Sequence, residues 1–222
     1  VTSTAVTAVD EDAAYSYTVT ATDVDVGDTL TMTGTTVPSW LTFDATTGIL
    51  AGTPLNANVG ANSVVITIND GTVDVTDTFT ITVANTNDAP TFTSTAVTAV
   101  DEDAAYSYTA AASDDDGDAV TLAGTTIPAW MTFDEGTTGV DLNGDGDYDD
   151  AGETAPVAAT YALTGTPTNS EVGSHTVVIT ATDTNSASTA QTFTVVVTNT
   201  NDAPVVTSTA VTAVDEDAAY SY

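Results

Sequence analysis

Lysine and arginine are absent from this chain of 222 residues, which has 32 aspartates and glutamates, one histidine and a formal net charge of −32. Nucleic acids bind proteins through cations that displace the phosphate counterions, and anionic lipid headgroups attract basic side chains in the same way. The composition therefore excludes nucleic acid as a partner. Because the carboxylates also lack salt-bridge partners within the chain, their repulsion opposes a compact state unless cations bind or the charge is spread.

Cysteine is absent as well, so no disulfide cross-links the fold. No apolar run approaches the roughly 18 residues that cross a bilayer, and we expect no direct membrane insertion. The chain opens on Val1-Thr2-Ser3 without a signal peptide, which we interpret as an internal piece of a longer protein. A hydrophobic content of 41% is too high for a disordered polyanion, and it predicts a packed core in one or two domains.

Features of a catalytic site are missing too. His175 occurs without cysteine or a second histidine, which excludes the usual zinc-ligand clusters. Pairs of acids that suit glycoside hydrolysis occur everywhere in so acidic a chain and are therefore uninformative. No nucleophile motif or glycine-rich phosphate loop accompanies them. We therefore expect a protein that is not an enzyme.

One phrase, TSTAVTAVDEDAAYSY, occurs three times, at residues 2–17, 93–108 and 207–222. Between its occurrences both full copies contain the same landmarks in the same order: Gly-Asp at 27–28 and 117–118, Pro-x-Trp at 38–40 and 128–130, Thr-Phe-Asp at 42–44 and 132–134, Gly-Thr-Pro at 52–54 and 165–167, and Asn-Thr-Asn-Asp-Ala-Pro at 85–90 and 199–204. Such self-similarity predicts a tandem array. We divide the chain into a first repeat (1–90), a second repeat (91–204) with an acidic insertion at about 134–160, and the start of a truncated third repeat (205–222).

Short alternating runs predict the secondary structure. Residues 63–68, 78–83 and 191–197 alternate polar side chains with valine, isoleucine or phenylalanine, which is the period of a half-buried strand. Turn residues such as Asn69-Asp70-Gly71 interrupt the runs, and no stretch shows a helical period. The expected fold is all-β, with tandem antiparallel β-sandwiches of about seven strands each, the pattern of an immunoglobulin-like sandwich.

Several landmarks also occur in a known family. The closing Asn-Thr-Asn-Asp-Ala-Pro is similar to the cadherin linker DxNDNxP, Asp23-Val24-Asp25 and Asp114-Asp115-Asp116 are similar to the cadherin DxD, and residues 43–49 are similar to FxIDxxTGxI. An acidic triplet, Asp10-Glu11-Asp12, lies near the start of the repeat. Over nearly its whole length the chain thus resembles bacterial cadherin-like repeats, in particular the dystroglycan-type cadherin-like and immunoglobulin-type domains of large surface adhesins. It departs from them in lacking a DRE motif and in its linker, which reads Thr-Asn-Asp-Ala-Pro.

The resemblance implies calcium at the junctions between repeats, where about six to eight oxygen ligands must converge from several loops. Carried over residue by residue, the first junction site comprises Glu11, Asp12, Asn85, Asn87, Asp88, Asp114, Asp116 and Asp183. Incomplete sites are expected at the two ends, with Asp23, Asp25 and Asp70 at one and Glu102, Asn199, Asn201 and Asp202 at the other. The alternative is that these are solvated turn residues, because Asp and Asn are common in turns for their own backbone hydrogen bonds.

The insertion contains a calcium-loop pattern of its own. Residues 141–146 fit D-x-[DN]-x-[DN]-G, in which alternate residues wrap one ion and Gly146 permits the sharp turn. The ligands expected from this spacing are Asp141, Asn143, Asp145, Asp147, Asp149 and Glu153. Glu153 lies one residue later than in an EF-hand and no helical pattern flanks the loop, so we expect a calcium loop on a β-hairpin, with a plain acidic hairpin as the alternative.

Three functions agree with these features. The first is a calcium-stiffened spacer of a bacterial surface adhesin or extracellular fibre, whose partners are neighbouring repeats and other copies in a fibre. Calcium is abundant outside cells and scarce inside them, so this function implies a secreted protein at the cell surface. The second is a polysaccharide- or protein-binding module, which solvent-exposed Trp40 and Trp130 would favour and buried ones would oppose. The third is a filament subunit that shares strands, which exposed, unpaired terminal strands would support.

Overall fold

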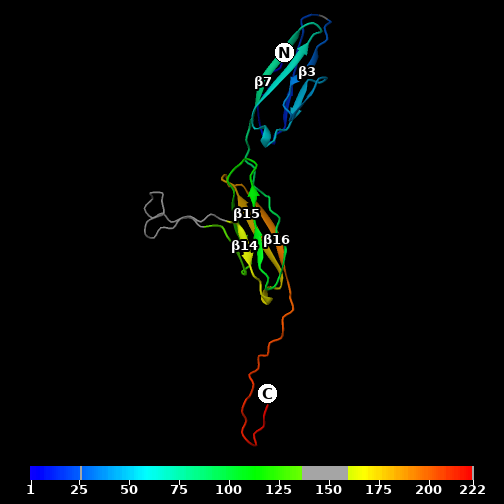
Figure 1. Ribbon diagram of the computed structural model, residues 1–222. Coiled ribbons are helices and arrows are strands. Elements are labelled where there is room, and N and C mark those ends of the chain that lie inside the picture. Colours follow the sequence, from blue (N-terminus) through cyan, green and yellow to red (C-terminus); the bar gives the residue numbers. More distant parts are fainter. Residues whose placement is uncertain (26, 137–159, 222) are drawn as a thin grey trace, which may run out of the picture. The chain divides into compact units, whose positions relative to one another are not determined.

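The computed structural model describes residues 1–25, 27–136 and 160–221 of the chain (Figure 1). These residues form β-strands joined by turns, and the helices among them are the three-residue 3-10 turns η1 (Asn56–Asn58) and η2 (Asn169–Glu171). In this part of the chain no helix has the length and apolar character needed to cross a bilayer. The prediction of an all-β fold is confirmed.

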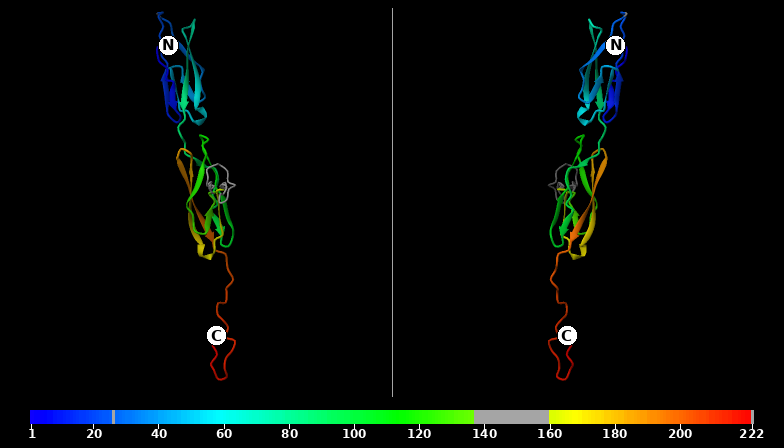
Figure 2. Two further views of the ribbon diagram at one scale, coloured as in Figure 1. Left: turned by 90° about the vertical axis from the view of Figure 1, so that its left-hand side faces the viewer. Right: turned by 90° about the vertical axis from the view of Figure 1, so that its right-hand side faces the viewer.

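Each repeat is a sandwich of two sheets, and its strands run along the length of that repeat (Figures 1 and 2). The strands of the first repeat are β1 (Ala8–Asp10), β2 (Tyr15–Thr18), β3 (Thr31–Thr36), β4 (Leu41–Asp44), β5 (Ile49–Gly52), β6 (Gly60–Asn69) and β7 (Asp74–Ala84). Those of the second repeat are β8 (Thr91–Phe92), β9 (Ala99–Asp101), β10 (Tyr106–Thr109), β11 (Ala112–Ser113), β12 (Thr121–Thr126), β13 (Met131–Phe133), β14 (Ala162–Gly165), β15 (Gly173–Thr182) and β16 (Ser188–Thr198).

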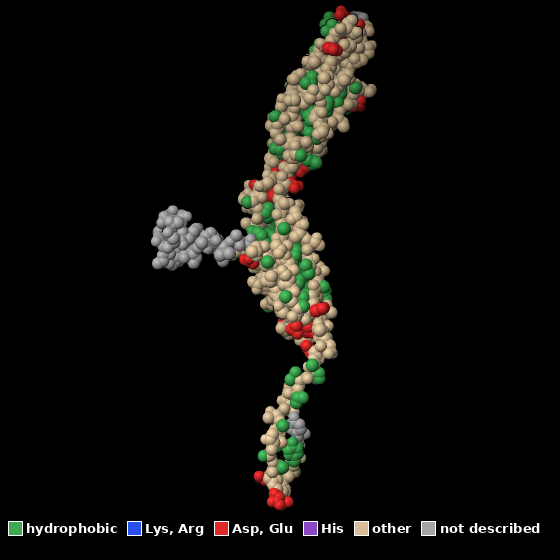
Figure 3. Space-filling model, in the orientation of Figure 1, with side chains coloured by type: hydrophobic (Ala, Val, Ile, Leu, Met, Phe, Trp, Pro, Cys, Tyr) green, Lys and Arg blue, Asp and Glu red, His purple; other side chains and the backbone are tan. Residues whose placement is uncertain are grey.

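In the first repeat one sheet has the strand order β1-β7-β6-β3 and the other the order β2-β5-β4. The long hairpin β6–β7 forms the centre of the first sheet, and its register places Gly60 opposite Val83. Side chains alternate along β6, so that Val64, Ile66 and Ile68 are buried while their neighbours are partly exposed. The outer faces are rich in threonine, and the sides of the sandwiches are mainly uncharged polar side chains and backbone in the view of Figure 3.

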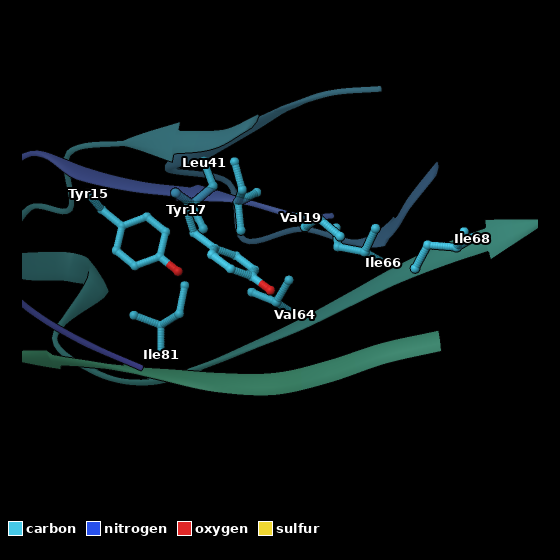
Figure 4. Close-up of a cluster of buried hydrophobic side chains, with 9 residues drawn as sticks. Tyr15, Tyr17, Val19, Leu41, Val64, Ile66, Ile68 and Ile81 are labelled. Carbon is cyan, nitrogen blue, oxygen red and sulfur yellow. The ribbon is translucent and has the colours of Figure 1, made fainter. Parts of the chain in front are cut away.

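The core of the first repeat lies between its two sheets (Figure 4). Tyr15 and Tyr17 of β2 pack there with Leu50 of β5 and the buried side chains of β6. Trp40 is half-buried against this cluster, and its ring meets Tyr15 edge-on at 5.8 Å, as the ring quadrupoles favour. Its Nε1 donates a hydrogen bond to Oδ1 of Asn62 (3.0 Å). These contacts favour a packing role for Trp40 over a ligand-binding role.

The second repeat follows the same plan, with sheets of order β12-β15-β16-β9 and β10-β14-β13 and a short pair formed by β8 and β11. Trp130 is half-buried and meets Tyr106 edge-on at 6.0 Å. One glycine in each repeat permits a close backbone approach. A Cβ on Gly52 would lie 2.1 Å from the carbonyl oxygen of Trp40, and a Cβ on Gly165 would lie 2.4 Å from that of Trp130.

The insertion lies between β13 and β14, where the first repeat has a short turn. In that turn Asp44 accepts hydrogen bonds from the N–H of Thr46 and the hydroxyl of Thr47, both at 2.8 Å. Its counterpart Asp134 accepts instead from the hydroxyl of Thr160, at 2.5 Å. The calcium ligands expected in the insertion, residues 141–153, lie outside the described residues.

The sandwiches are not wholly antiparallel, because one short strand near the start of each repeat pairs in parallel with the last strand of that repeat. β1 pairs with β7, with Ala8 opposite Thr82, and β9 pairs with β16, with Ala99 opposite Val196. Parallel strands end at the same edge of a sheet, so the Asp-Glu-Asp triplet, which begins at the last residue of β1, lies beside the linker that follows β7. This pairing positions the candidate site.

The phrase that occurs three times closes a local loop in every copy. Residues 205–221 are exposed and form no strand, and yet they contain the same bond as the two sandwiches. In each copy a tyrosine hydroxyl donates to the carbonyl nine residues earlier: Tyr15 to Val6 (2.8 Å), Tyr106 to Val97 (2.7 Å) and Tyr220 to Val211 (3.0 Å). The bond therefore follows from the local sequence and does not need the rest of the sandwich.

The chain divides into two compact units. The first comprises residues 1–95, 110–125 and 179–191, and the second comprises residues 96–109, 126–178 and 192–222. The first unit thus contains the first repeat, its linker (residues 85–90) and the loops that precede β12 and follow β15. All contacts of the main candidate site lie within this unit.

Candidate metal site

The backbone fixes Glu11 against the start of the linker. Glu11 follows β1 directly, and its N–H donates to the carbonyl of Ala84, the last residue of β7 (2.9 Å). Asp12 has a φ of 59°, a left-handed conformation that aspartate adopts more readily than most residues. Its N–H donates to the carbonyl of Pro54 (2.8 Å). The two bonds hold the acidic triplet in a tight turn at the base of the linker.

Glu11 is buried, with 3% of its surface exposed. Its Oε1 accepts a hydrogen bond from the N–H of Thr86 in the linker (3.0 Å), whereas its Oε2 is buried and has no partner among the described residues. A buried, uncompensated carboxylate costs on the order of several kcal/mol. Because the chain has no lysine or arginine to supply the opposite charge, the free oxygen indicates a position for a bound cation.

Two further carboxylates converge on Glu11. Asp116, in the loop before β12, accepts the N–H of Asp88 at Oδ2 (2.7 Å), and its Oδ1 is buried and unpaired within the described chain. Asp88 accepts at Oδ2 from the side-chain amide of Asn56 (2.8 Å). One oxygen from each of Glu11, Asp88 and Asp116 lies within 4.8 Å of the others. In all three carboxylates an N–H group occupies one oxygen and leaves the other available.

Asp114 adds a fourth carboxylate beside them. Its Oδ1 accepts hydrogen bonds from the N–H groups of Asp116 (3.0 Å) and Asp118 (3.3 Å). Its Oδ2 is buried without a partner in the described part of the chain. Burial, and then the charge of Asp116, raise the pKa of Asp88. Because like charges at this spacing repel, a divalent cation among them would stabilise the arrangement and protons would compete with it.

Linker residue Asn87 contacts a different acid. Its Nδ2 donates to Oδ2 of Asp183 (2.8 Å), and its Oδ1 accepts from the side-chain amide of Asn185 (2.6 Å). Asp183 is 6% exposed, and its Oδ1 accepts the N–H of Ala187 (2.8 Å). The hydrogen bond from Asn87 lowers the pKa of Asp183. Since both oxygens of Asp183 already have protein donors, its observed contacts anchor the linker.

The structure therefore brings most of the predicted junction residues to one place, in different roles. The carboxylates with available oxygens are Glu11, Asp88, Asp114 and Asp116. Asp12 lines a neighbouring hollow together with Asp88 and Asp115. Asn85 is exposed, and its side chain makes no hydrogen bond to any other described residue.

The residues predicted at one end of the first repeat are only partly assembled. Asp23 and Asp25 come together with Asp28, with one oxygen of each within 4.8 Å of the others, and all three are exposed. Asp70 is engaged by its own turn, where its Oδ1 accepts the N–H of Val73 (2.7 Å). Backbone hydrogen bonds of this turn, that of Val73 first, lower the pKa of Asp70.

The predicted end site of the second repeat repeats the contacts of Glu11. Glu102 is 3% exposed, its Oε1 accepts the N–H of Thr200 (2.5 Å) and the amide of Asn199 (2.6 Å), and its Oε2 is buried and unpaired among the described residues. Asp202 accepts at Oδ2 from the side-chain amide of the first residue of η2 (2.6 Å). Asn201 donates only to the neighbouring carbonyl of Asp202 (3.3 Å) within the described chain.

The available atoms of the main site are all carboxylate oxygens, which suit a hard cation such as Ca²⁺. The three clustered carboxylates of Glu11, Asp88 and Asp116 supply up to half of the six to eight ligands that calcium takes, and the rest can come from the neighbouring Asp114, backbone carbonyls and water. The residues present therefore fit calcium. Nothing among them resembles an activated nucleophile, so the arrangement is suited to binding an ion.

The uncharged groups that donate hydrogen bonds to the acids were not predicted from the sequence. Asn56 and Asn169 each occupy the second position after the proline of the Gly-Thr-Pro landmark, which was a visible signal. Asp28 belongs to the repeated Gly-Asp landmark, and its place beside Asp23 follows from that landmark. Asn185 lies in a loop that is one residue longer than its counterpart in the first repeat, so no repeated pattern marked it.

A family model described as Putative Ig domain matches residues 1–84 and 89–198. Among solved structures, the endo-fucoidan hydrolase MfFcnA4 from glycoside hydrolase family 107 is 26% identical with a TM-score of 0.37, and the match covers 88% of this chain but only 28% of that chain. PcdhgB3 EC1-4 is 18% identical with a TM-score of 0.46, covering 88% of this chain and 48% of that one. Human Protocadherin-24 EC1-2 is 16% identical with a TM-score of 0.41, covering 83% and 88%. No curated protein matches the chain.

Proposed function

The chain belongs to the Putative Ig domain family, and we propose that it is a spacer segment of a bacterial surface adhesin or extracellular fibre, in which calcium stiffens the linkers between β-sandwich repeats. The observation that carries the proposal is Glu11, whose buried Oε2 has no donor in the described chain and whose carboxylate clusters with those of Asp88 and Asp116. A bound cation would compensate the charge of this cluster of one buried and two partly buried carboxylates, because the chain has no lysine or arginine to do so.

The ion would connect three segments of the chain. Glu11 belongs to the turn after β1, Asp88 belongs to the linker, and Asp116 belongs to the loop before β12. Without an ion these acids repel one another, whereas a shared cation makes each of them attract the same centre. Calcium would therefore replace the repulsion among these carboxylates with attraction to a shared ion, and it would hold the linker at both of its ends.

Calcium is the proposed ion because it accepts many protein oxygens at once, while magnesium usually retains several waters and seldom occupies an all-protein site. Because calcium is abundant outside cells, the proposed function is an extracellular one. A spacer of this kind would act by projecting a binding region away from the surface that carries it, with neighbouring repeats of the same chain as its partners.

Thermal unfolding with EDTA and with calcium tests the binding step. A ligand that binds only the folded state stabilises it by about 2.7 kcal/mol at 100 times its Kd, so the midpoint should rise clearly with calcium concentration. An equal concentration of magnesium is the matched control and should raise the midpoint much less. A midpoint that does not respond to calcium would refute the proposal.

Stiffening needs a separate measurement, and the absence of cysteine makes it practical. Cysteines introduced at exposed positions of β3 in the first unit and β14 in the second, as Thr33→Cys with Thr164→Cys, would carry paired spin labels. Calcium should narrow the distribution of distances between them, and Glu11→Gln should abolish the narrowing. Calcium binding without any narrowing would leave the site as an ion-binding site and exclude the spacer mechanism.

A further inference from the structure

Each short 3-10 turn carries an asparagine that contacts the linker of its own repeat. Nδ2 of Asn56 donates to Oδ2 of Asp88 (2.8 Å), and Nδ2 of Asn169 donates to Oδ2 of Asp202 (2.6 Å). Asp88 and Asp202 are the same residue of the Asn-Thr-Asn-Asp-Ala-Pro linker in the two repeats. We propose that this asparagine is a positioning residue that sets the orientation of the linker carboxylate for the cation, an inference that rests on the proposed calcium-binding function.

The asparagine is not needed to build the turn. In η1 the N–H of Leu55 is capped by the side chain of Asn58 (2.9 Å), and in η2 the N–H of Thr168 is capped by the side chain of Glu171 (2.8 Å). The turn segments read Leu-Asn-Ala-Asn at 55–58 and Thr-Asn-Ser-Glu at 168–171, so only the second residue is the same. The two repeats therefore differ in the residues that make the turn and agree in the one that contacts the linker.

A hydrogen bond to one oxygen restricts the whole carboxylate. Without it the carboxylate of Asp88 would rotate about its terminal bond, and its position relative to Glu11 and Asp116 would be averaged over several orientations. With Oδ2 held by Asn56, the other oxygen has no donor in the described chain and keeps a fixed direction. Holding one oxygen by an N–H group is also what the structure does at Glu11 and Asp116.

An uncharged donor suits this position better than a charged one. An amide N–H satisfies one oxygen of Asp88 and leaves the full negative charge of the carboxylate for the cation. A lysine in place of Asn56 would form an ion pair with Asp88 and compete with the metal. In a chain without lysine or arginine, amides, hydroxyls and backbone N–H groups are the donors that remain.

The contact is set within one repeat and its own linker. In the second unit Asp202 is held by Asn169, and Glu102 is bound to the N–H of Thr200, although residues 205–221 beyond the linker form no strand. The same two bonds occur in the first unit. Each repeat thus orients the carboxylate of the linker at its own end, while loops of the next repeat add ligands and further contacts to that linker.

Asn56→Ala is the variant that tests the role. Loss of an outer residue that orients a metal ligand typically weakens metal binding roughly 10- to 100-fold, and we expect a loss in this range for calcium. A calcium titration followed by the amide NMR signal of Ala89, next to Asp88, distinguishes this site from any other in the chain. Asn58→Ala is the matched control, because it removes the cap of the same turn without touching the linker. It should lower stability in EDTA and leave the calcium affinity of the site nearly unchanged.

A double-mutant cycle separates positioning from a general structural effect. If Asn56 acts through Asp88, then Asn56→Ala should weaken calcium binding in the wild-type background and have no further effect in an Asp88→Ala background. Equal losses in both backgrounds, or an unchanged affinity in Asn56→Ala alone, would overturn the inference while leaving the calcium site in place. A wild-type chain whose Ala89 signal does not respond to calcium would overturn the proposed function together with it.

Discussion

Replacing Glu11 by glutamine should change stability in opposite directions with and without calcium. The substitution keeps the size of the side chain and an oxygen that can accept the N–H of Thr86, and it removes the charge. In the absence of metal the wild-type protein contains a carboxylate that is 3% exposed and has one unpaired oxygen. Glu11→Gln removes this buried charge, and it also removes a ligand from the proposed site.

The expected magnitudes follow from these two effects. An unpaired buried polar group costs about 1–3 kcal/mol when neutral and more when charged, so the calcium-free variant should be more stable than wild type by about 1–3 kcal/mol. Extracellular calcium modules have Kd values of about 10⁻⁴ to 10⁻³ M, so about 10 mM calcium stabilises a site at the tight end of this range by about 2.7 kcal/mol. Each tenfold loss of affinity removes about 1.4 kcal/mol of that gain. For a domain of the size of the first repeat, 1 kcal/mol shifts Tm by about 4–8 °C. The variant should have the higher Tm in EDTA and the wild type the higher Tm in calcium, and this reversal should be easy to observe.

Thermal unfolding followed by circular dichroism, in EDTA and at rising calcium, measures both effects on the same samples. Glu216→Gln is the matched control, because Glu216 has the same flanking sequence as Glu11 and is exposed. It should leave both midpoints unchanged. If Glu11→Gln lowers Tm equally in EDTA and in calcium, then Glu11 serves only as an acceptor for the linker, and the argument for a cation fails.

Three further predictions concern the sandwiches. Leu50 is fully buried, so Leu50→Ala should destabilise the first repeat by about 2–5 kcal/mol in urea unfolding, while Ile49→Ala on the same strand, at a side chain that is 39% exposed, should cost much less. Gly52→Ala places a Cβ against the carbonyl of Trp40 and should cost about 1–3 kcal/mol or more, and a denaturation midpoint equal to that of wild type would show that the strand can move aside. Burial raises the pKa of Tyr15 and of Tyr106 to about 12, so these phenols hold their protons more tightly when folded. The stability they contribute is complete below pH 10 and should be lost as pH rises from about 10 to about 12, which tyrosinate absorbance and circular dichroism recorded together would reveal; titration of every tyrosine near pH 10 in the folded protein would contradict it.

The all-β fold could be predicted because its signals are local. Alternation along residues 63–68 and 78–83 specifies which side chains of β6 and β7 are buried, and glycine and asparagine mark the turns. The parallel pairing of β1 with β7 could not be predicted in this way. β1 has three residues and its partner lies more than 70 positions away, so neither periodicity nor turn type determines the pairing.

The acidic residues of the candidate site could be predicted from the sequence, whereas the groups that donate hydrogen bonds to them could not. Glu11, Asp88 and Asp116 were predicted because the resemblance carries acids at those positions, and the structure brings one oxygen of each together. The donors that hold them are the N–H of Thr86 and the amide of Asn56. A backbone N–H has no sequence signature, and an asparagine in a turn has many local uses, so a charge pattern alone does not reveal either donor.

The tyrosine-to-carbonyl bond that closes a local loop in all three copies bears on how such an array folds. Adjacent repeats with identical segments risk assembling with strands borrowed from a neighbour, which is a characteristic misfolding route of repeat proteins. A loop of about ten residues closes in about 10–100 ns, long before distant segments meet. The bond from Tyr220 to Val211 is present without any strand partner, so each segment can close upon itself before it encounters another copy. Each copy of the repeated segment can thus form its local loop independently during folding, which favours assembly of each sandwich from its own part of the chain.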